Sequence, residues 1–105
     1  MKGLGDMGQL LRQAKQLQEQ FQHKQAEIQA LRVSASAGGG MVTATVNGQG
    51  ELADLKIEPE VVDPNDLEML TDLVVAAVQQ AQRTARKQAE ELLGPLAQGM
   101  GIPVP

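Results

Sequence analysis

The sequence contains no cysteine, tryptophan or tyrosine, and only one phenylalanine and one histidine among 105 residues. Without cysteine the chain can form no disulfide, no Cys-ligated zinc site, no iron–sulfur cluster and no thiol nucleophile. Without aromatic faces it has no stacking platform for single-stranded nucleic acid. A His-rich metal site or a Ser–His–Asp triad would depend on His23 alone. We therefore expect no bound metal and no cofactor.

Long hydrophobic runs are also missing. The longest, from Leu73 to Val78, has six residues, whereas a helix needs about 20 to cross a bilayer. The first residues lack the apolar stretch of a signal peptide. The formal net charge of −4 on average repels nucleic acid and acidic membranes. We expect a cytoplasmic protein with no membrane partner.

Apolar side chains recur at steps of three and four residues over residues 7–31, and only Lys24 interrupts this heptad pattern. No Pro or Gly occurs between Gln9 and Leu31. The pattern predicts a helix of about 24 residues, about 36 Å long. Such a helix is too long to lie over a small core, so it should project and offer its stripe to a partner helix: Met7, Leu10, Ala14, Leu17, Phe21, Ile28 and Leu31.

The period then changes to two, which predicts strands. Val and Ala alternate with Ser and Thr in residues 33–37 and 42–46. A third strand should cover residues 51–57 with three apolar side chains on one side: Ala53, Leu55 and Ile57. The segment is therefore predicted to form a three-stranded antiparallel meander.

Glycines mark both turns of this meander. Residues 38–40 are all glycine and permit the first turn. Asn47-Gly48 predicts a tight type I′ turn, in which both central residues have positive φ.

A second long helix should follow the sheet. Asp63 can cap it, Pro64 suits its first position, and Asp66 adds an acidic side chain to its first turn. Gly94-Pro95 predicts its end near Leu93. The second half of its apolar stripe is a lane of alanines that would let another helix approach closely: Ala81, Ala85 and Ala89.

The predicted fold class is α+β, a single domain over residues 1–95 with a flexible tail at 96–105. A three-stranded sheet has two faces, and two projecting helices can cover only part of one of them. This favours a homodimer with projecting helical arms over the alternative, a compact monomer. Candidate dimer-interface residues are the apolar ones of the sheet and second helix: Val42, Val46, Leu55, Leu70, Val74 and Val78.

Few motifs indicate chemistry. The segment from Gly3 to Gly8 matches G-x-G-x-x-G, but no strand precedes it, so we expect a flexible N-terminal arm and no nucleotide site. His23 lies outside the heptad stripe and should be solvated. No pair of residues resembles a nucleophile with its base, which indicates a protein that is not an enzyme and has no small-molecule substrate.

The cations are segregated from the acids. Residues 32–72 hold eight acidic and two basic side chains. Because the two helices should run antiparallel from the sheet, their basic groups are expected to converge about 28 Å from it. Such groups suit phosphate contacts with double-stranded DNA. The alternative is a solvated face that forms ion pairs such as Lys87 with Glu91. Candidate DNA-binding residues are Lys2, Arg12, Lys15, Arg83, Arg86 and Lys87.

Taken in order along the chain, these segments resemble the YbaB/EbfC family of bacterial nucleoid-associated proteins. The resemblance depends on the glycine- and methionine-containing start, the Gln-rich helix with Lys15, the Gly38–Val42 turn, Val46-Asn47-Gly48 and the block 70–77. It implies a tweezer-shaped dimer, DNA binding with little sequence preference, a location in the nucleoid, a role in nucleoid organisation or gene regulation, and no catalysis.

A second hypothesis is a protein-interaction module whose layout resembles prefoldin-type chaperones, with strands between two long helices. It would hold a protein partner at the apolar ends of the arms and would bind no DNA. The residues involved would be Leu10, Leu11, Leu92 and Leu93.

Overall fold

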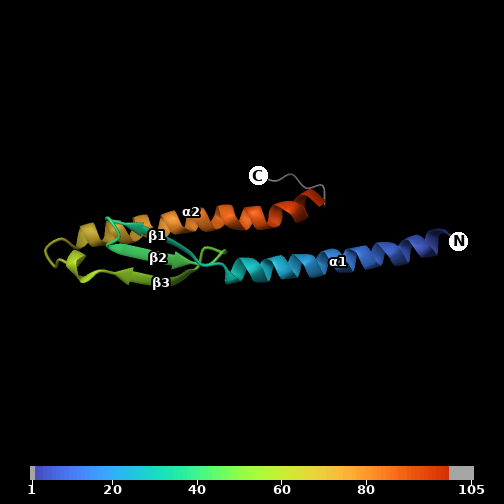
Figure 1. Cartoon of the computed structure of the whole chain (residues 1–105), viewed down its shortest axis with the longest axis horizontal. Coiled ribbons are helices and arrows are strands. Elements are labelled where there is room, and N and C mark those ends of the chain that lie inside the picture. Colours follow the sequence, from blue (N-terminus) through green and yellow to red (C-terminus); the bar gives the residue numbers. More distant parts are fainter. Residues whose placement is uncertain (1, 100–105) are drawn as a thin grey trace.

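The computed structural model describes residues 2–99, and the surroundings of the side chains from 6 to 96. The order is helix, three strands and helix, as predicted, with a short 3₁₀ helix before the second long helix. The molecule measures 79 × 21 × 16 Å, and its radius of gyration is 20.8 Å, against about 13 Å for a compact chain of this length. Figure 1 shows why: α1 (Lys2–Ala30) projects away from the sheet. The α+β fold with a projecting arm is therefore confirmed.

The sheet has two chemically different faces. Strands β1 (Val33–Ala37), β2 (Val42–Val46) and β3 (Leu52–Ile57) are antiparallel in the order β1-β2-β3. One face carries Val and Ala side chains. On the other, hydroxyl pairs join β1 to β2: the oxygens of Ser34 and Thr45 are 2.7 Å apart, and those of Ser36 and Thr43 are 3.0 Å apart. The alternating pattern of the sequence thus separates a core face from a polar face.

The helix α2 (Leu67–Gly99) lies flat on the apolar face, over β1 and β2 (Figure 1). Its alanines Ala77, Ala81 and Ala85 have no exposed surface and pack in the same core as Val42 and Val46 of β2, which are equally buried. Small side chains let a helix approach a sheet closely. Ala81 and Ala85 were expected to receive another helix, and for these two residues the expectation was wrong because the sheet itself packs on them. Ala89 is half-buried and lies outside this core.

The β3 strand begins at Leu52 and is irregular at its start. Val46 pairs with Leu52 and Thr45 pairs with Asp54, so Ala53 has no partner on β2 and lies in a β-bulge. Ala53 is exposed, whereas Leu55 and Ile57 are half-buried. The bulge thus leaves Ala53 without a partner and exposed at the start of β3, while Leu55 and Ile57 pair with Ala44 and Val42 and pack against the core.

Glycine makes both hairpin turns, but the second differs from its predicted type. Gly38, Gly39 and Gly40 have φ of 65°, 68° and 93°, values that only glycine adopts readily. In the second turn Gly50 has a φ of 84°, while Asn47 and Gly48 do not have positive φ. The turn is a three-residue loop with glycine in the left-handed position, and the predicted type I′ turn was wrong.

The side chain of Asn47 organises this second turn. Its Oδ1 accepts hydrogen bonds from the backbone N–H groups of Gln49 and Glu51, both at 3.0 Å, and its Nδ2 donates to Glu51 Oε1 at 2.8 Å. The side chain is almost fully buried, so these bonds satisfy groups that water cannot reach.

One contact joins α1 to this turn. The backbone N–H of Gly48 donates to the carbonyl oxygen of Ile28 at 2.9 Å. Ile28 lies in the last turn of α1, where carbonyls lack partners within the helix. A Cβ on Gly48 would fall inside contact distance of that oxygen. The turn thus holds the end of α1 through backbone atoms, and only glycine fits.

The predicted helix ends need three corrections. First, α1 starts at Lys2, so the glycine-rich segment expected as a flexible arm is helical. Second, α2 starts at Leu67, because Asp66 Oδ1 caps the N–H of Met69 at 3.2 Å while Asp63 forms a turn by accepting from the N–H of Asn65 at 2.9 Å.

Third, α2 continues through Pro95 to Gly99 instead of ending near Leu93. A proline inside a helix removes one hydrogen bond and bends the helix rather than always ending it. Four residues of the expected tail are therefore helical, and the rest of that expectation, residues 100–105, lies outside the described residues.

Substituting Gly48 by alanine should destabilise the protein. The added Cβ would push the last turn of α1 off the hairpin and weaken the 2.9 Å bond to Ile28. We expect the free energy of unfolding in urea to fall by about 2–4 kcal/mol. Gly8→Ala is the matched control, because its Cβ would meet only Arg12 at 3.8 Å, and it should not destabilise the chain. Equal stability of the two variants would contradict this account of the contact.

Candidate nucleic-acid interface

The first group of candidate cations lies on the projecting part of α1. Arg12 and Lys15 are exposed, and Arg12 is 16 residues before Ile28, about 24 Å along the helix axis. Lys2 is in the same helix, but its side chain lies outside the part that the structure describes. The arm therefore carries two exposed cations well away from the sheet.

The second group lies on α2, beside the hairpin that holds α1. Arg83, Arg86 and Lys87 are exposed. Arg83 and Lys87 are each two residues from the buried Ala85, which places them about 160° around the helix from the core. Arg86 lines a pocket of about 220 Å³ with Gln82 and the turn residues 48–50.

Gln82 fixes this stretch of α2 against the turn. Its Nε2 donates to the carbonyl oxygen of Gly50 at 3.0 Å. The basic stretch of α2 is therefore level with the end of the sheet.

The two groups do not converge, and this prediction was wrong. The prediction assumed that α2 points away from the sheet from its first residue onward, just as α1 points away from the sheet when it is followed from its last residue backward. Because Ala77, Ala81 and Ala85 pack in the core with β1 and β2, the first half of α2 runs along the sheet. The α2 cations lie near the root of the arm and the α1 cations lie farther out.

None of these cations forms an ion pair within the described side chains. Arg83 Nη2 donates to Gln80 Oε1, a neutral acceptor, at 3.0 Å. The expected pair of Lys87 with Glu91 is not formed; the ion pairs among residues 6–96 are both made by Glu27. Cations without a carboxylate partner are available to an anionic ligand.

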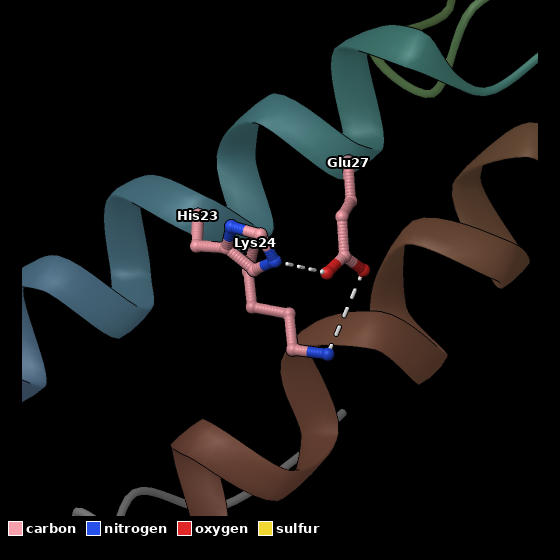
Figure 2. A network of polar contacts seen from close by, with 3 residues as sticks. All are labelled: His23, Lys24 and Glu27. Carbon is pink, nitrogen blue, oxygen red and sulfur yellow. Dashed lines mark ion pairs between the residues drawn. The ribbon is translucent and has the colours of Figure 1, made fainter.

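The carboxylate of Glu27 holds two α1 side chains where α1 faces α2 (Figure 2). It lies 3.0 Å from His23 Nε2 and 3.6 Å from Lys24 Nζ. His23 is 76% exposed, as predicted, whereas Lys24 is 31% exposed. Figure 2 shows Lys24 and Glu27 extending toward α2. The residue that interrupts the heptad is thus accommodated by an ion pair at the base of the arm.

Arg32 is a cation that sequence reasoning left without a role. Its Nη1 donates to the carbonyl oxygens of Gln29 at 3.1 Å and Leu31 at 2.8 Å. A cation at a helix C-terminus satisfies orphan carbonyls and complements the helix dipole. A basic residue directly after a predicted helix was the signal that could have identified this cap.

The acids gather at the end of the molecule opposite the arm. Residues 58–72 include six acidic side chains and no basic one. Because the whole chain has a charge of −4, the remainder has a charge of +2. Asp72 is 11 residues before Arg83, about 16 Å along α2, which exceeds the screening length of about 8 Å at physiological salt. The acidic end therefore does little to weaken the field around the basic stretch.

The candidate dimer residues divide into two sets. Val42 and Val46 have no exposed surface and fill the core under α2, so they offer nothing to a second chain. Leu55, Leu70, Val74 and Val78 are half-buried and keep some accessible surface.

Other kinds of site are not found in the described part of the chain. No group of three or more His, Asp or Glu side chains in it could hold a metal ion. Neither helix, within residues 2–99, combines the length and apolar character needed to cross a membrane.

These features define a small α+β protein with a three-stranded meander, a projecting helical arm and unpaired cations on both long helices. The model of the YbaB/EbfC DNA-binding family matches residues 2–100, and the chain belongs to this family. The resemblance seen in the sequence is confirmed. The family is one of nucleoid-associated DNA-binding proteins.

Relatives and a solved structure agree with this assignment. A nucleoid-associated protein of Rhodococcus opacus is 52% identical over 99 residues, which cover 94% of this chain and 88% of the relative. One from Clostridium perfringens is 52% identical over 101 residues, covering 96% and 90%. The crystal structure of the uncharacterised protein HP0035 from Helicobacter pylori has the same fold, with a TM-score of 0.73 at 22% identity, over 85% of this chain and 94% of that one.

Neutralising the α2 cations should leave the fold intact. Lys87 and Arg86 are exposed and make no ion pair within the described side chains, so Arg86→Gln and Lys87→Gln should each change the free energy of unfolding by less than about 0.5 kcal/mol. Urea denaturation measures this. A loss above about 1 kcal/mol in either variant would indicate a structural role and contradict the description of these residues as free cations.

Proposed function

We propose that this chain is a dimeric nucleoid-associated protein that binds double-stranded DNA mainly through phosphate contacts, with low sequence specificity. In this role it organises the nucleoid or modulates transcription. The observation that carries the proposal is the set of exposed cations without ion-pair partners on α1 and α2, together with membership of a DNA-binding family.

Phosphate contacts are the chemistry that these cations suit best. Lys and Arg neutralise phosphates and release condensed counterions, so affinity from such contacts is independent of sequence and falls with salt. The cations of the arm and of α2 are spread along the long axis. This spread favours contact with an extended backbone over recognition of one short base sequence.

Dimerisation is supported by apolar surface that one protomer leaves uncovered. Met7, Leu10 and Leu11 on the outer part of α1 are 61%, 63% and 66% exposed. Val75 of α2 is 46% exposed, and Leu52 is 51% exposed because α2 covers β1 and β2 and leaves β3 at the edge. Met7, Leu10 and Leu11 lie within about one turn of the helix and together form an apolar patch, a feature that often marks an interaction surface.

Fluorescence anisotropy of a labelled duplex of about 30 base pairs tests the DNA proposal. Affinity should fall linearly on a log–log plot against salt, and each lost phosphate contact should reduce the slope by about 0.9. The triple variant R83Q/R86Q/K87Q should therefore lose about 2–3 from the slope. Two duplexes of unrelated sequence should bind within about tenfold of each other, since specific readout gives ratios of 10³ or more.

A matched pair of lysines controls for net charge. Lys87→Gln and Lys56→Gln each remove one exposed cation, but Lys56 lies on the polar face of the sheet, opposite Thr43 of β2. Only Lys87→Gln should reduce the slope. Equal effects of the two would mean that overall charge, and no particular surface, governs binding, and absence of binding at low salt would refute the DNA proposal.

The dimer has its own test. Light scattering after size exclusion should give about 22 kDa, twice the 11.2 kDa of one chain. Leu55→Asp places a charge on half-buried β3 surface and should shift the mass toward one chain. Asp54→Ala, at the neighbouring exposed position on the polar side, should not. A wild-type mass of one chain at micromolar concentration would contradict the dimer.

A second function, a protein-interaction module without direct DNA binding, is favoured by the exposed Leu10 and Leu11. Leu92, which was included in that hypothesis, is half-buried and lines a pocket with Leu31, Gln88 and Glu91. The absence of DNA binding at low salt would favour this function.

A further inference from the structure

An apolar pocket opens at the end of the molecule opposite the arm. It lies where the first turns of α2 meet the β1–β2 turn and the 3₁₀ helix η1 (Pro59–Val61) (Figure 1). Its volume is about 280 Å³. The residues that line it are Gly38, Met41, Glu60, Val61, Met69 and Leu73. None of them is among the residues proposed to contact DNA.

The lining is apolar and adaptable. Met69 is 42% exposed, and Met41 and Leu73 are half-buried. Methionine side chains are flexible and polarizable, and they are frequent on surfaces that accept varied apolar partners. Gly38 has a φ of 65°, and a Cβ there would lie 3.0 Å from Leu73. Because glycine has no side chain, the space beside Leu73 stays open on this side of the pocket.

The pocket belongs to the acidic part of the chain, residues 58–72. One of its lining residues, Glu60, is acidic. All six acidic side chains of residues 58–72 are exposed, and none forms an ion pair within the described part of the chain. The set consists of Glu58, Glu60, Asp63, Asp66, Glu68 and Asp72. An apolar pocket in an acidic stretch of the surface is complementary to a segment with apolar anchors and flanking Lys or Arg.

We propose that this surface, the acidic-end pocket, binds a cationic amphipathic segment of another protein. An apolar side chain of the segment fills the space beside Met41 and Met69, and its Lys and Arg side chains face the carboxylates. A second copy of this chain fits poorly, because a symmetric contact would bring two sets of six carboxylates together. The segments that line the pocket lie at the opposite end from the arm (Figure 1), so both can be occupied at once, and the inference holds whether or not the arm binds DNA.

Methionine-methyl NMR on the full chain tests the proposal. The probe is a synthetic amphipathic helical peptide with leucines along one face and lysines along the other. On titration, the methyl signals of Met41 and Met69 should shift and saturate, while that of Met7, on the distant arm, should stay in place. A peptide with glutamate in place of lysine should cause no shift.

Matched variants separate the pocket from general attraction to an acidic protein. Met69→Gln should weaken peptide binding by about tenfold, the effect of losing a central apolar anchor, and Met7→Gln should leave it unchanged. E60Q/E68Q should weaken binding more than E90Q/E91Q, which removes the same charge from the far part of α2.

Three results would overturn the proposal. The first is the absence of any shift at Met41 and Met69. The second is equal binding by wild type and Met69→Gln, which would indicate attraction by charge alone. The third is a shift of the same methyl signals on concentrating the protein without peptide, because a second copy would then occupy the pocket.

Discussion

The structure depends on one backbone contact, the hydrogen bond from Gly48 N–H to the carbonyl oxygen of Ile28. Ile28 is buried at the end of α1, and its carbonyl also accepts from the N–H of Leu31 at 3.2 Å. Everything before this turn of α1 extends beyond the sheet (Figure 1). The direction of the arm, and so the position of its cations, is set where a glycine lets a hairpin and a helix end touch.

A second constraint places the remaining charges. Ala77, Ala81 and Ala85 of α2 pack on β1 and β2 with no exposed surface, which turns Arg83 and Lys87 outward near the end of α1 that contacts the sheet. The acidic side chains of residues 58–72, before and at the start of α2, lie at the end of the molecule opposite the arm. A chain of net charge −4 thus separates its charges along a 79 Å axis, and its average charge says little about which ligand each end attracts.

Periodicity was enough to predict the elements and their order, because core-facing alternation in the strands and heptad spacing in α1 are local properties of the sequence. The exact turns and ends were not predictable, since competing signals stand side by side. Asn47-Gly48 and Gly50 both permit a turn, and Asp63 and Asp66 can both cap a helix; packing of the hairpin against Ile28 and of α2 on the sheet selects among such options.

The candidate DNA-binding site was also predictable only in part from the sequence. The exposure of Arg12, Lys15, Arg83, Arg86 and Lys87 followed from their place on the helix faces. Their relative positions did not, because the sequence pattern of Ala81 and Ala85 suits a helix or a sheet equally well. Only the tertiary structure shows that the sheet occupies this lane and that the two basic groups are apart.

The direction of the arm can be measured directly, because the chain has no cysteine and spin labels can be placed at will. Labels at Gln13→Cys on the arm and Glu58→Cys at the opposite end of the sheet, diluted with unlabelled protein to suppress distances between chains, report the direction of the arm by pulsed electron resonance. The N–H of Glu58 donates to the carbonyl oxygen of Met41 at 2.8 Å, so the length of β2, about 15 Å, separates it from the hairpin that contacts Ile28. Residue 13 is 15 residues before Ile28, about 22 Å along the helix, so the account predicts a single distance of at least about 35 Å. A main distance below about 15 Å would mean that α1 folds back over the sheet, and it would contradict the projecting arm on which the proposed function depends.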